Sequence, residues 1–169
     1  MWETDATSVL TAEGTATVFV LVDHYTQECL GIHAARRGTR FEALEPRRQA
    51  IRSVVYGGFT EGCARGLSLR HDHGSQYISR HFQKELAFLG ISSSPSFVRE
   101  PEGNGCTERF NRILKEQLLW RRRFTTVDAL NDALQEFKEQ YNTHWRAQRH
   151  HHMSPLQARI EAMALKVAS

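Results

Sequence analysis

Three carboxylates that are far apart along the chain have the residue types that metal-dependent phosphoryl transfer needs. Asp5 lies in W-E-T-D-A-T, Asp72 in R-H-D-H-G-S-Q-Y and Glu108 in P-E-G-N-G-C-T-E-R-F. Asp72 directly follows a short apolar run, where a carboxylate is costly unless it is paired, hydrogen-bonded or bound to a metal ion. Because Mg²⁺ prefers hard oxygen ligands, we take these three residues as candidate catalytic residues and metal ligands.

The segment around Glu108 has a second polar feature. Asn104, Glu108, Arg112 and Lys115 follow one another at spacings of four, four and three residues, so they share one face of a predicted helix. The opposite face carries an apolar stripe: Phe110, Ile113, Leu114 and Leu118. On helix geometry alone, an exposed Glu108–Arg112 pair is the favoured interpretation. A carboxylate beside basic residues would also place metal and phosphate ligands side by side.

Apolar periodicity and turn residues predict the elements that must position these side chains. The predicted order is strands at 4–10, 16–24 and 28–35, a helix at 41–57, a strand at 66–72, a helix at 79–90, a strand at 91–98, and helices at 106–119 and 125–145. This order predicts an α/β fold with a mixed sheet and helices on its faces. Asp72 would follow a central strand, at the edge where such sheets bind ligands.

Local signals refine these boundaries. Pro46 must start or interrupt its helix, and Gly90 is a plausible residue after a helix end. Thr125 and Asp128 resemble a capping box. The polar loop at 99–105 has the glycines of a mobile active-site flap. The expected organisation is one catalytic core over 1–155, followed by a tail at 156–169 that could form a short helix.

Composition limits the classes of protein. The chain has 169 residues, 40% hydrophobic and 24% charged, which is ordinary for one globular domain. We find neither an apolar run long enough for a membrane span nor a signal-peptide pattern. The three cysteines lack metal-ligand spacing and suit a reducing cytoplasm. We therefore expect a cytoplasmic protein without a membrane partner.

Charge alone does not identify a partner, because the net charge is only +3. Six basic residues nevertheless crowd into fifteen positions: Arg109, Arg112, Lys115, Arg121, Arg122 and Arg123. A solvated helix face and a nucleic-acid surface are the two interpretations of this cluster.

Several other residues resemble site residues but have simpler explanations. His71 and His73 flank Asp72, and alternation along a strand predicts packing or solvent roles for them. Asp23 is expected to be a residue at a hairpin end. The run 150–152 consists of three histidines that point in different directions, so we expect an exposed turn.

The three motifs together resemble the catalytic core of insertion-sequence transposases that have a retroviral-integrase-like domain. The resemblance rests on W-x-x-D-A-T, on D-H-G-S-Q-Y and on P-E-G-N-G-C-T-E-R-F-N-R-I-L-K-E, in that order. Thirty-five residues separate Asp72 from Glu108, which is similar to the family spacing of the second aspartate and the glutamate. The similarity runs from Trp2 to about Pro155 and includes Y-N at 141–142 and S-P at 154–155.

This resemblance implies a ribonuclease H-like fold with a five-stranded mixed sheet. It also implies a metal triad of Asp5, Asp72 and Glu108 that holds two Mg²⁺ or Mn²⁺ ions. The implied enzyme is a polynucleotidyl transferase that nicks transposon ends and joins the freed 3′-hydroxyl to another phosphodiester. Implied partners are double-stranded DNA, at transposon ends and target, and further copies of the chain on that DNA. In a bacterium such a protein would associate with the nucleoid.

Lys115 is the first residue we assign to DNA, because it shares the Glu108 face and matches a basic family position. The further candidates are Arg112, Arg99, Asn104, Gln76, Arg121, Arg122 and Arg123. Ser75 and Tyr77 also match the second motif and are candidates for positioning substrate.

Two alternatives to the transposase core remain open. Family members of this type carry a helix-turn-helix region before the core, and no segment here resembles one. We therefore expect a fragment, an isolated domain or a decayed gene product, with salt-sensitive and largely non-specific DNA binding. One alternative is a non-catalytic DNA-binding remnant. The other is a stand-alone metal nuclease of the same fold that cuts RNA–DNA hybrids or branched DNA.

Overall fold

The protein is built on one five-stranded mixed sheet. A computed structural model describes residues 1–53, 58–96 and 105–167, and Arg99, Asn104 and the predicted flap up to residue 104 lie outside this part. The strands are β1 (Trp2–Thr11), β2 (Gly14–Asp23), β3 (Cys29–Ala35), β4 (Ser68–His71) and β5 (Ser92–Pro95). Their order is β3-β2-β1-β4-β5, antiparallel on the β3–β1 side and parallel on the β4–β5 side. The predicted five-stranded mixed sheet is confirmed.

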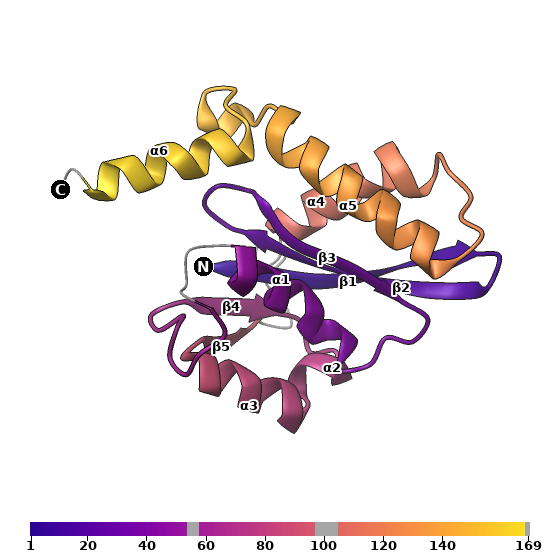
Figure 1. Ribbon diagram of the computed structural model, residues 1–169, viewed down its shortest axis with the longest axis horizontal. Coiled ribbons are helices and arrows are strands. Elements are labelled where there is room, and N and C mark those ends of the chain that lie inside the picture. Colours follow the sequence, from indigo (N-terminus) through magenta and orange to yellow (C-terminus); the bar gives the residue numbers. More distant parts are fainter. Residues whose placement is uncertain (54–57, 97–104, 168–169) are drawn as a thin grey trace.

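Helices cover both faces of this sheet (Figure 1). They are α1 (Glu45–Ser53), α2 (Ser75–Ile78), α3 (Arg80–Leu89), α4 (Gly105–Leu114), α5 (Val127–His144) and α6 (Pro155–Val167). One 3₁₀ turn, Glu42–Leu44, precedes α1, and a π-helical turn, η3 (Lys115–Leu119), continues α4. Helices α4 and α5 lie on one face, whereas α1 and α3 lie on the other, and α6 extends away from the sheet.

Strand β2 shows why two helical layers form. Its side chains from Val18 to Val22 are almost completely buried, as expected for a continuous apolar strand. Alternate residues enter different cores: Val20 packs with the α4 and α5 side chains, whereas Phe19 and Leu21 pack with those of α1 and α3. Each of these helices carries apolar side chains along one face, at a period of 3.6 residues, and packs this face against the sheet.

Side-chain amides cover the edge of the sheet that β3 forms. Asn142 and Asn131 on α5 each accept from a backbone N–H of β3 and donate to the carbonyl of the same residue, Cys29 and Ala34 respectively. Gln49 on α1 does the same at Ile32. These amides occupy the hydrogen-bonding positions of a missing sixth strand, so they protect an edge that would otherwise invite pairing.

The residues at the beginnings and ends of the helices were predicted only in part. Gly90 follows α3 in the left-handed region (φ 77°), and Pro46 lies in the first turn of α1, as predicted. The predicted capping residue Thr125 is wrong by one position, because Thr126 accepts from the N–H of Ala129 instead. Since Phe124 forms a β-bridge with Thr11, the backbone is still extended at Thr126 and the helix begins later.

The histidine run at 150–152 is only partly the exposed turn that we predicted. His151 and His152 are exposed and have positive φ angles. His150 is buried, and its Nε2 lies 2.6 Å from the carbonyl oxygen of Tyr25. A tertiary contact with the turn after β2 therefore holds the first histidine.

Among the described helices, none is long and apolar enough to cross a membrane.

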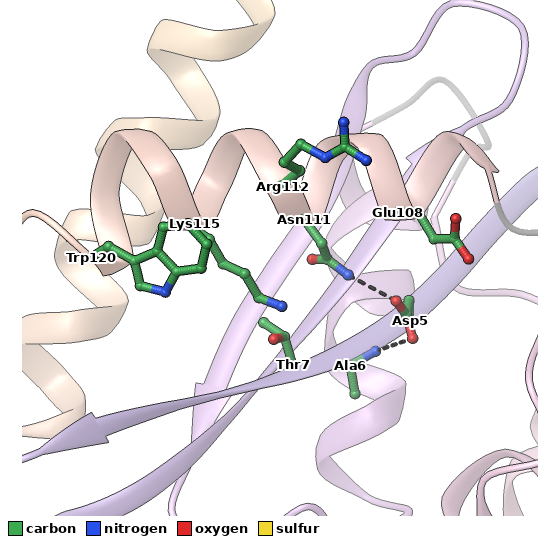
Figure 2. Close-up of a pocket in the computed structure, with 8 residues that line it drawn as sticks. All are labelled: Asp5, Ala6, Thr7, Glu108, Asn111, Arg112, Lys115 and Trp120. Atoms are coloured by element: carbon green, nitrogen blue, oxygen red, sulfur yellow. Dashed lines mark hydrogen bonds between the residues drawn. The ribbon is translucent and has the colours of Figure 1, made fainter.

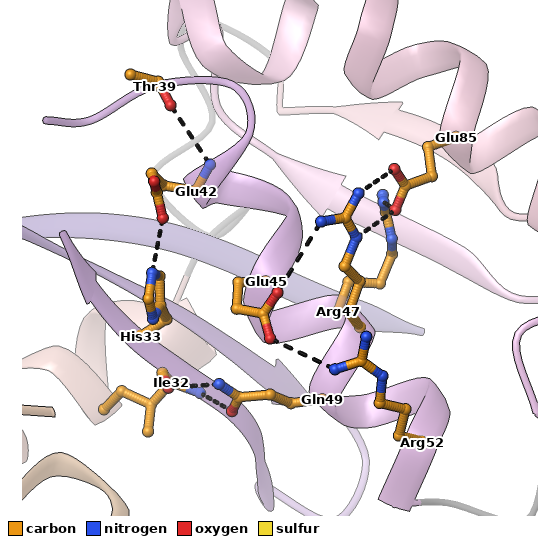
Figure 3. A network of polar contacts seen from close by, with 10 residues as sticks. Ile32, His33, Thr39, Glu42, Glu45, Arg47, Gln49, Arg52 and Glu85 are labelled. Carbon is orange, nitrogen blue, oxygen red and sulfur yellow. Dashed lines mark hydrogen bonds and ion pairs between the residues drawn. The ribbon is translucent and has the colours of Figure 1, made fainter. Parts of the chain in front are cut away.

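A buried ion pair joins the two helices on the second face of the sheet (Figure 3). Arg47 of α1 is 1% exposed and pairs with Glu85 of α3, which also pairs with Arg48. Burial lowers the pKa of Arg47, and the Glu85 carboxylate opposes this shift. Removing one partner of a buried pair leaves an uncompensated charge.

We therefore expect Glu85→Gln to lower the free energy of unfolding by about 3–5 kcal/mol, because Arg47 loses its counter-ion. Glu45→Gln is the control, since Glu45 is 30% exposed and lies 3.8–4.0 Å from its arginine partners. Its cost should stay below about 1 kcal/mol. Urea unfolding measures both values, and equal losses in the two variants would contradict the importance of the buried pair.

Candidate active site

Sheet register places the first two candidate carboxylates next to each other. Parallel pairing of β1 with β4 aligns Trp2 with Leu69 and Glu3 with Arg70. Two residues further along each of the two segments, the same alignment brings Asp5 beside Asp72, which directly follows β4. The Asp72 side chain accepts from the N–H of Gly74 at 2.8 Å, which holds it at the turn into α2.

A buried acid on β1 positions the helix that carries the third carboxylate. Glu3 is completely buried and accepts a hydrogen bond from the backbone N–H of Thr107, in the first turn of α4. Its other oxygen lies 2.5 Å from Nδ1 of His24. A carboxylate is favourable at a helix N-terminus, where backbone N–H groups lack partners. Glu3 therefore fixes the turn that presents Glu108.

Asn111 connects the helix to the strand. Asp5 and Glu3 are two residues apart on β1, so both side chains face α4. The Asn111 amide donates to Oδ2 of Asp5 at 2.8 Å, while Oδ1 of Asp5 accepts from the N–H of Ala6. The buried Oδ1 of Asn111 has no hydrogen-bond partner among the described residues. This oxygen is a further hard donor atom next to the carboxylates.

Asp5 shows the electrostatic cost of this arrangement. Burial is the largest cause that raises its pKa, and the charges of Asp72 and Glu108 raise it further. The hydrogen bonds from Ala6 and Asn111 act in the opposite direction without cancelling the shift. The negative charges of Asp72 and Glu108 therefore act on Asp5, and its two hydrogen bonds compensate only part of the rise in its pKa.

A cavity of about 330 Å³ lies between β1 and α4 (Figure 2). Asp5 and Glu108 lie near one end, and Lys115 and Trp120 near the other. The Lys115 amine extends toward Thr7. The cavity thus combines carboxylates with the cationic side chain of Lys115, which can bind a phosphate.

The donor set fits a hard divalent cation. Carboxylate and amide oxygens are the ligands that Mg²⁺ and Mn²⁺ accept, and Mg²⁺ retains several waters. Across residues 1–53, 58–96 and 105–167, no three His, Cys, Asp or Glu side chains lie close enough to form a ready-made metal site. The oxygen ligands and the raised pKa of Asp5 support binding of such a cation. The three carboxylates are nevertheless not gathered into a compact cluster in the described structure.

The predicted DNA-contacting residues in the described structure are spread over three places. Lys115 and Arg112 line the cavity, and Gln76 lies on α2 just after Asp72. Arg121, Arg122 and Arg123 are exposed where η3 ends, and the Arg121 side chain donates to the Glu116 carbonyl.

The remaining candidates have structural roles. His71 is completely buried and bridges the Asp72 carbonyl and the Ser93 hydroxyl, which confirms its packing role. Asp23 accepts from the N–H groups of Tyr25 and Thr26 and closes the hairpin end, as predicted. Tyr77 is also completely buried, and its role in positioning substrate stays a prediction.

Sequence analysis missed Glu3 and Asn111. Asn111 follows Glu108 by three residues, so helical spacing alone could have placed it on the same face. Glu3 had a weaker signal: it alternates with Asp5 along a strand, but its burial depends on α4.

Comparisons with known proteins identify the family and the fold of this chain. The family profile described as integrase core domain matches residues 1–101, and a second integrase core domain profile matches residues 89–155. The transposase for insertion sequence element IS904 of Lactococcus lactis subsp. lactis is 28% identical over 149 residues, which are 85% of this chain and 54% of that protein. The chain therefore spans about half the length of this relative.

Solved structures show the same fold. The catalytic core domain of BIV integrase superimposes with a TM-score of 0.72 at 18% identity, covering 98% of this chain and 97% of the other. The HTLV-2 integrase catalytic core domain in complex with magnesium gives 0.69 at 19% identity, covering 93% of each chain. The fold is ribonuclease H-like, and the chain belongs to the integrase core domain family.

The raised pKa of Asp5 leads to a stability prediction. Because the native state holds this proton more tightly than the unfolded chain, its contribution to stability declines as pH rises from 3.8 through the raised pKa. Ionisation of this side chain is therefore destabilising. In EDTA at pH 7.5, Asp5→Asn should therefore raise the melting temperature by about 2–4 °C, the shift expected for about 1 kcal/mol.

Asn111 can reverse its amide to accept from the new side chain, because its Oδ1 has no partner in the described structure. Asp132→Asn, at an exposed position on α5, is the matched control and should leave the melting temperature unchanged. A lower melting temperature for Asp5→Asn would show that its hydrogen bonds outweigh the charge repulsion.

Proposed function

We infer that this chain is the catalytic core of a transposase, which cleaves DNA phosphodiesters and transfers strands with divalent metal ions. One observation carries this inference: Asp5, Asp72 and Glu108 come from three different elements, yet the charges of the other two raise the pKa of Asp5. Family membership supports the same chemistry.

Each residue has a defined task in the proposed reaction. Asp5, Asp72 and Glu108 would hold the metal ions, and Asn111 orients Asp5 through its amide. Two bound ions would activate the attacking oxygen and stabilise the leaving oxygen of an in-line displacement. Lys115 would bind a phosphate next to the reacting one, because its amine lies within the same cavity.

The proposed reaction has two steps with the same geometry. Water first attacks a phosphodiester at a transposon end and releases a 3′-hydroxyl. That hydroxyl then attacks a phosphodiester of the target DNA, so one bond forms as another breaks. No covalent protein intermediate is required.

Double-stranded DNA and further copies of this chain are the proposed partners. The HTLV-2 integrase catalytic core domain has been solved in trimeric and dimeric forms. We propose that this chain also assembles on DNA, where each copy would supply one carboxylate site.

Plasmid nicking tests the proposed chemistry. With Mn²⁺, the wild-type chain should nick supercoiled plasmid, and Asp72→Asn and Glu108→Gln should each lose at least about 100-fold in rate. Glu116→Gln is the matched control, because Glu116 is exposed on η3 outside the cavity and its loss should change nothing.

Circular dichroism would confirm that the variants are folded. Equal nicking by all four proteins would overturn the triad. An intact plasmid with folded wild-type protein would favour the non-catalytic remnant, whereas a preference for RNA–DNA hybrid or branched substrates would favour a stand-alone nuclease.

A further inference from the structure

A second cavity, of about 740 Å³, adjoins the carboxylate cavity. Its walls are residues 8–11 of β1 with the following Ala12, and residues from the segment between Lys115 and Thr125. The walls are joined where the Ala12 N–H donates to the Phe124 carbonyl at 2.9 Å, at the β-bridge between Thr11 and Phe124. This backbone contact fixes the position of one wall relative to the other.

The groove displays large apolar side chains to solvent. Trp120 is 72% exposed and Leu10 is 74% exposed. The other two tryptophans are covered: Trp2 is 2% exposed, and Trp145 packs against Tyr141. An indole on the surface is unusual enough to indicate a binding role.

The π-helical turn explains why Trp120 stays exposed. Its backbone N–H donates to the carbonyl of Lys115, five residues earlier, and so closes η3. Leu118 and Leu119 are buried and anchor this turn to the core. Turns of π-helix often occur at functional sites. The turn that fixes Trp120 is therefore a second indication that this residue has a function.

The charge of the groove selects an anionic occupant. Lys115, Arg122 and Arg123 line it, and none of its described lining residues is acidic. A flat aromatic ring beside several cations is the combination that binds single-stranded nucleic acid, with bases stacked on the ring and phosphates near the cations.

The two cavities form one path, because Lys115 and Trp120 line both of them. Leu10 follows Asp5 by five positions along the extended strand, a span of about 17 Å. At duplex spacing this corresponds to roughly five nucleotides along one strand. A strand with its reacting phosphate at the carboxylates can therefore reach the groove.

We propose that this groove binds one strand of the DNA substrate and that Trp120 stacks on an unpaired base of that strand, within about five nucleotides of the reacting phosphate. The proposal rests on the proposed function for the position of the reacting phosphate. Trp120 is a substrate-binding residue in this scheme, and Lys115 holds the backbone between the two cavities.

Oligonucleotide binding in EDTA tests the groove without metal or catalysis. Fluorescence anisotropy of a labelled oligothymidylate would be measured with wild type, Trp120→Leu and Trp120→Phe. Trp120→Leu should weaken binding roughly 5- to 100-fold, the effect of losing one stacked base, while Trp120→Phe should keep most of the affinity. Phe41→Leu is the matched control, since Phe41 is 50% exposed outside the groove.

Salt dependence provides an independent measurement. Arg122→Gln should reduce the slope of log affinity against log salt by roughly 0.7, the value for one lost contact with single-stranded phosphate. An unchanged slope, together with wild-type affinity in Trp120→Leu, would overturn the proposal, as would no oligonucleotide binding by the wild-type chain. Loss of self-association in Trp120→Leu without any change in DNA affinity would assign the groove to a second copy instead.

An incorrect assignment of the groove and an incorrect assignment of the triad give different experimental results. If Trp120→Leu binds DNA normally while Asp72→Asn loses nicking, the groove is wrong and the proposed function stands. If Trp120→Leu loses binding while Asp72→Asn nicks normally, the triad is wrong and the groove stands.

Discussion

The packing of α4 against the central strand β1 is the contact on which the candidate site depends. Glu3 binds the first turn of the helix, and Asp5 accepts from Asn111 one turn later. Because both acids lie on the same face of β1, a shift of one residue in the strand would turn both away from the helix. The long antiparallel pairing with β2 and the parallel pairing with β4 fix that register.

The same contact concentrates charge that the protein does not neutralise. Glu3 gains a helix N-terminus and a histidine as partners, so its burial has a structural explanation. Asp5 receives two hydrogen bonds, yet its pKa remains raised. A site that keeps its carboxylates in mutual repulsion gains stability when a cation binds, which links the stability of the fold to the proposed chemistry.

Much of the fold could be predicted from local patterns. The apolar run of β2 and the turn residues predicted the strands, whereas the assignment of the three acids to one metal site stays a prediction. Residues that depend on tertiary contacts were missed: Glu3 resembles an ordinary surface acid until α4 packs on it, and His150 is buried only by Tyr25. Thr126 replaced Thr125 as the capping residue because a β-bridge at Phe124 keeps the chain extended. Trp120 had no signal in the sequence, since its exposure follows from the π-helical turn.

The central claim is that Asp5, Asp72 and Glu108 hold a divalent cation together. Thermal unfolding with increasing Mn²⁺ tests this most directly, because an ion bound only by the native state raises the melting temperature. The account predicts a concentration-dependent rise for the wild-type chain, which Asp5→Asn and Glu108→Gln remove and Asp132→Asn retains. The same rise in all four proteins, or none in the wild type, would contradict it.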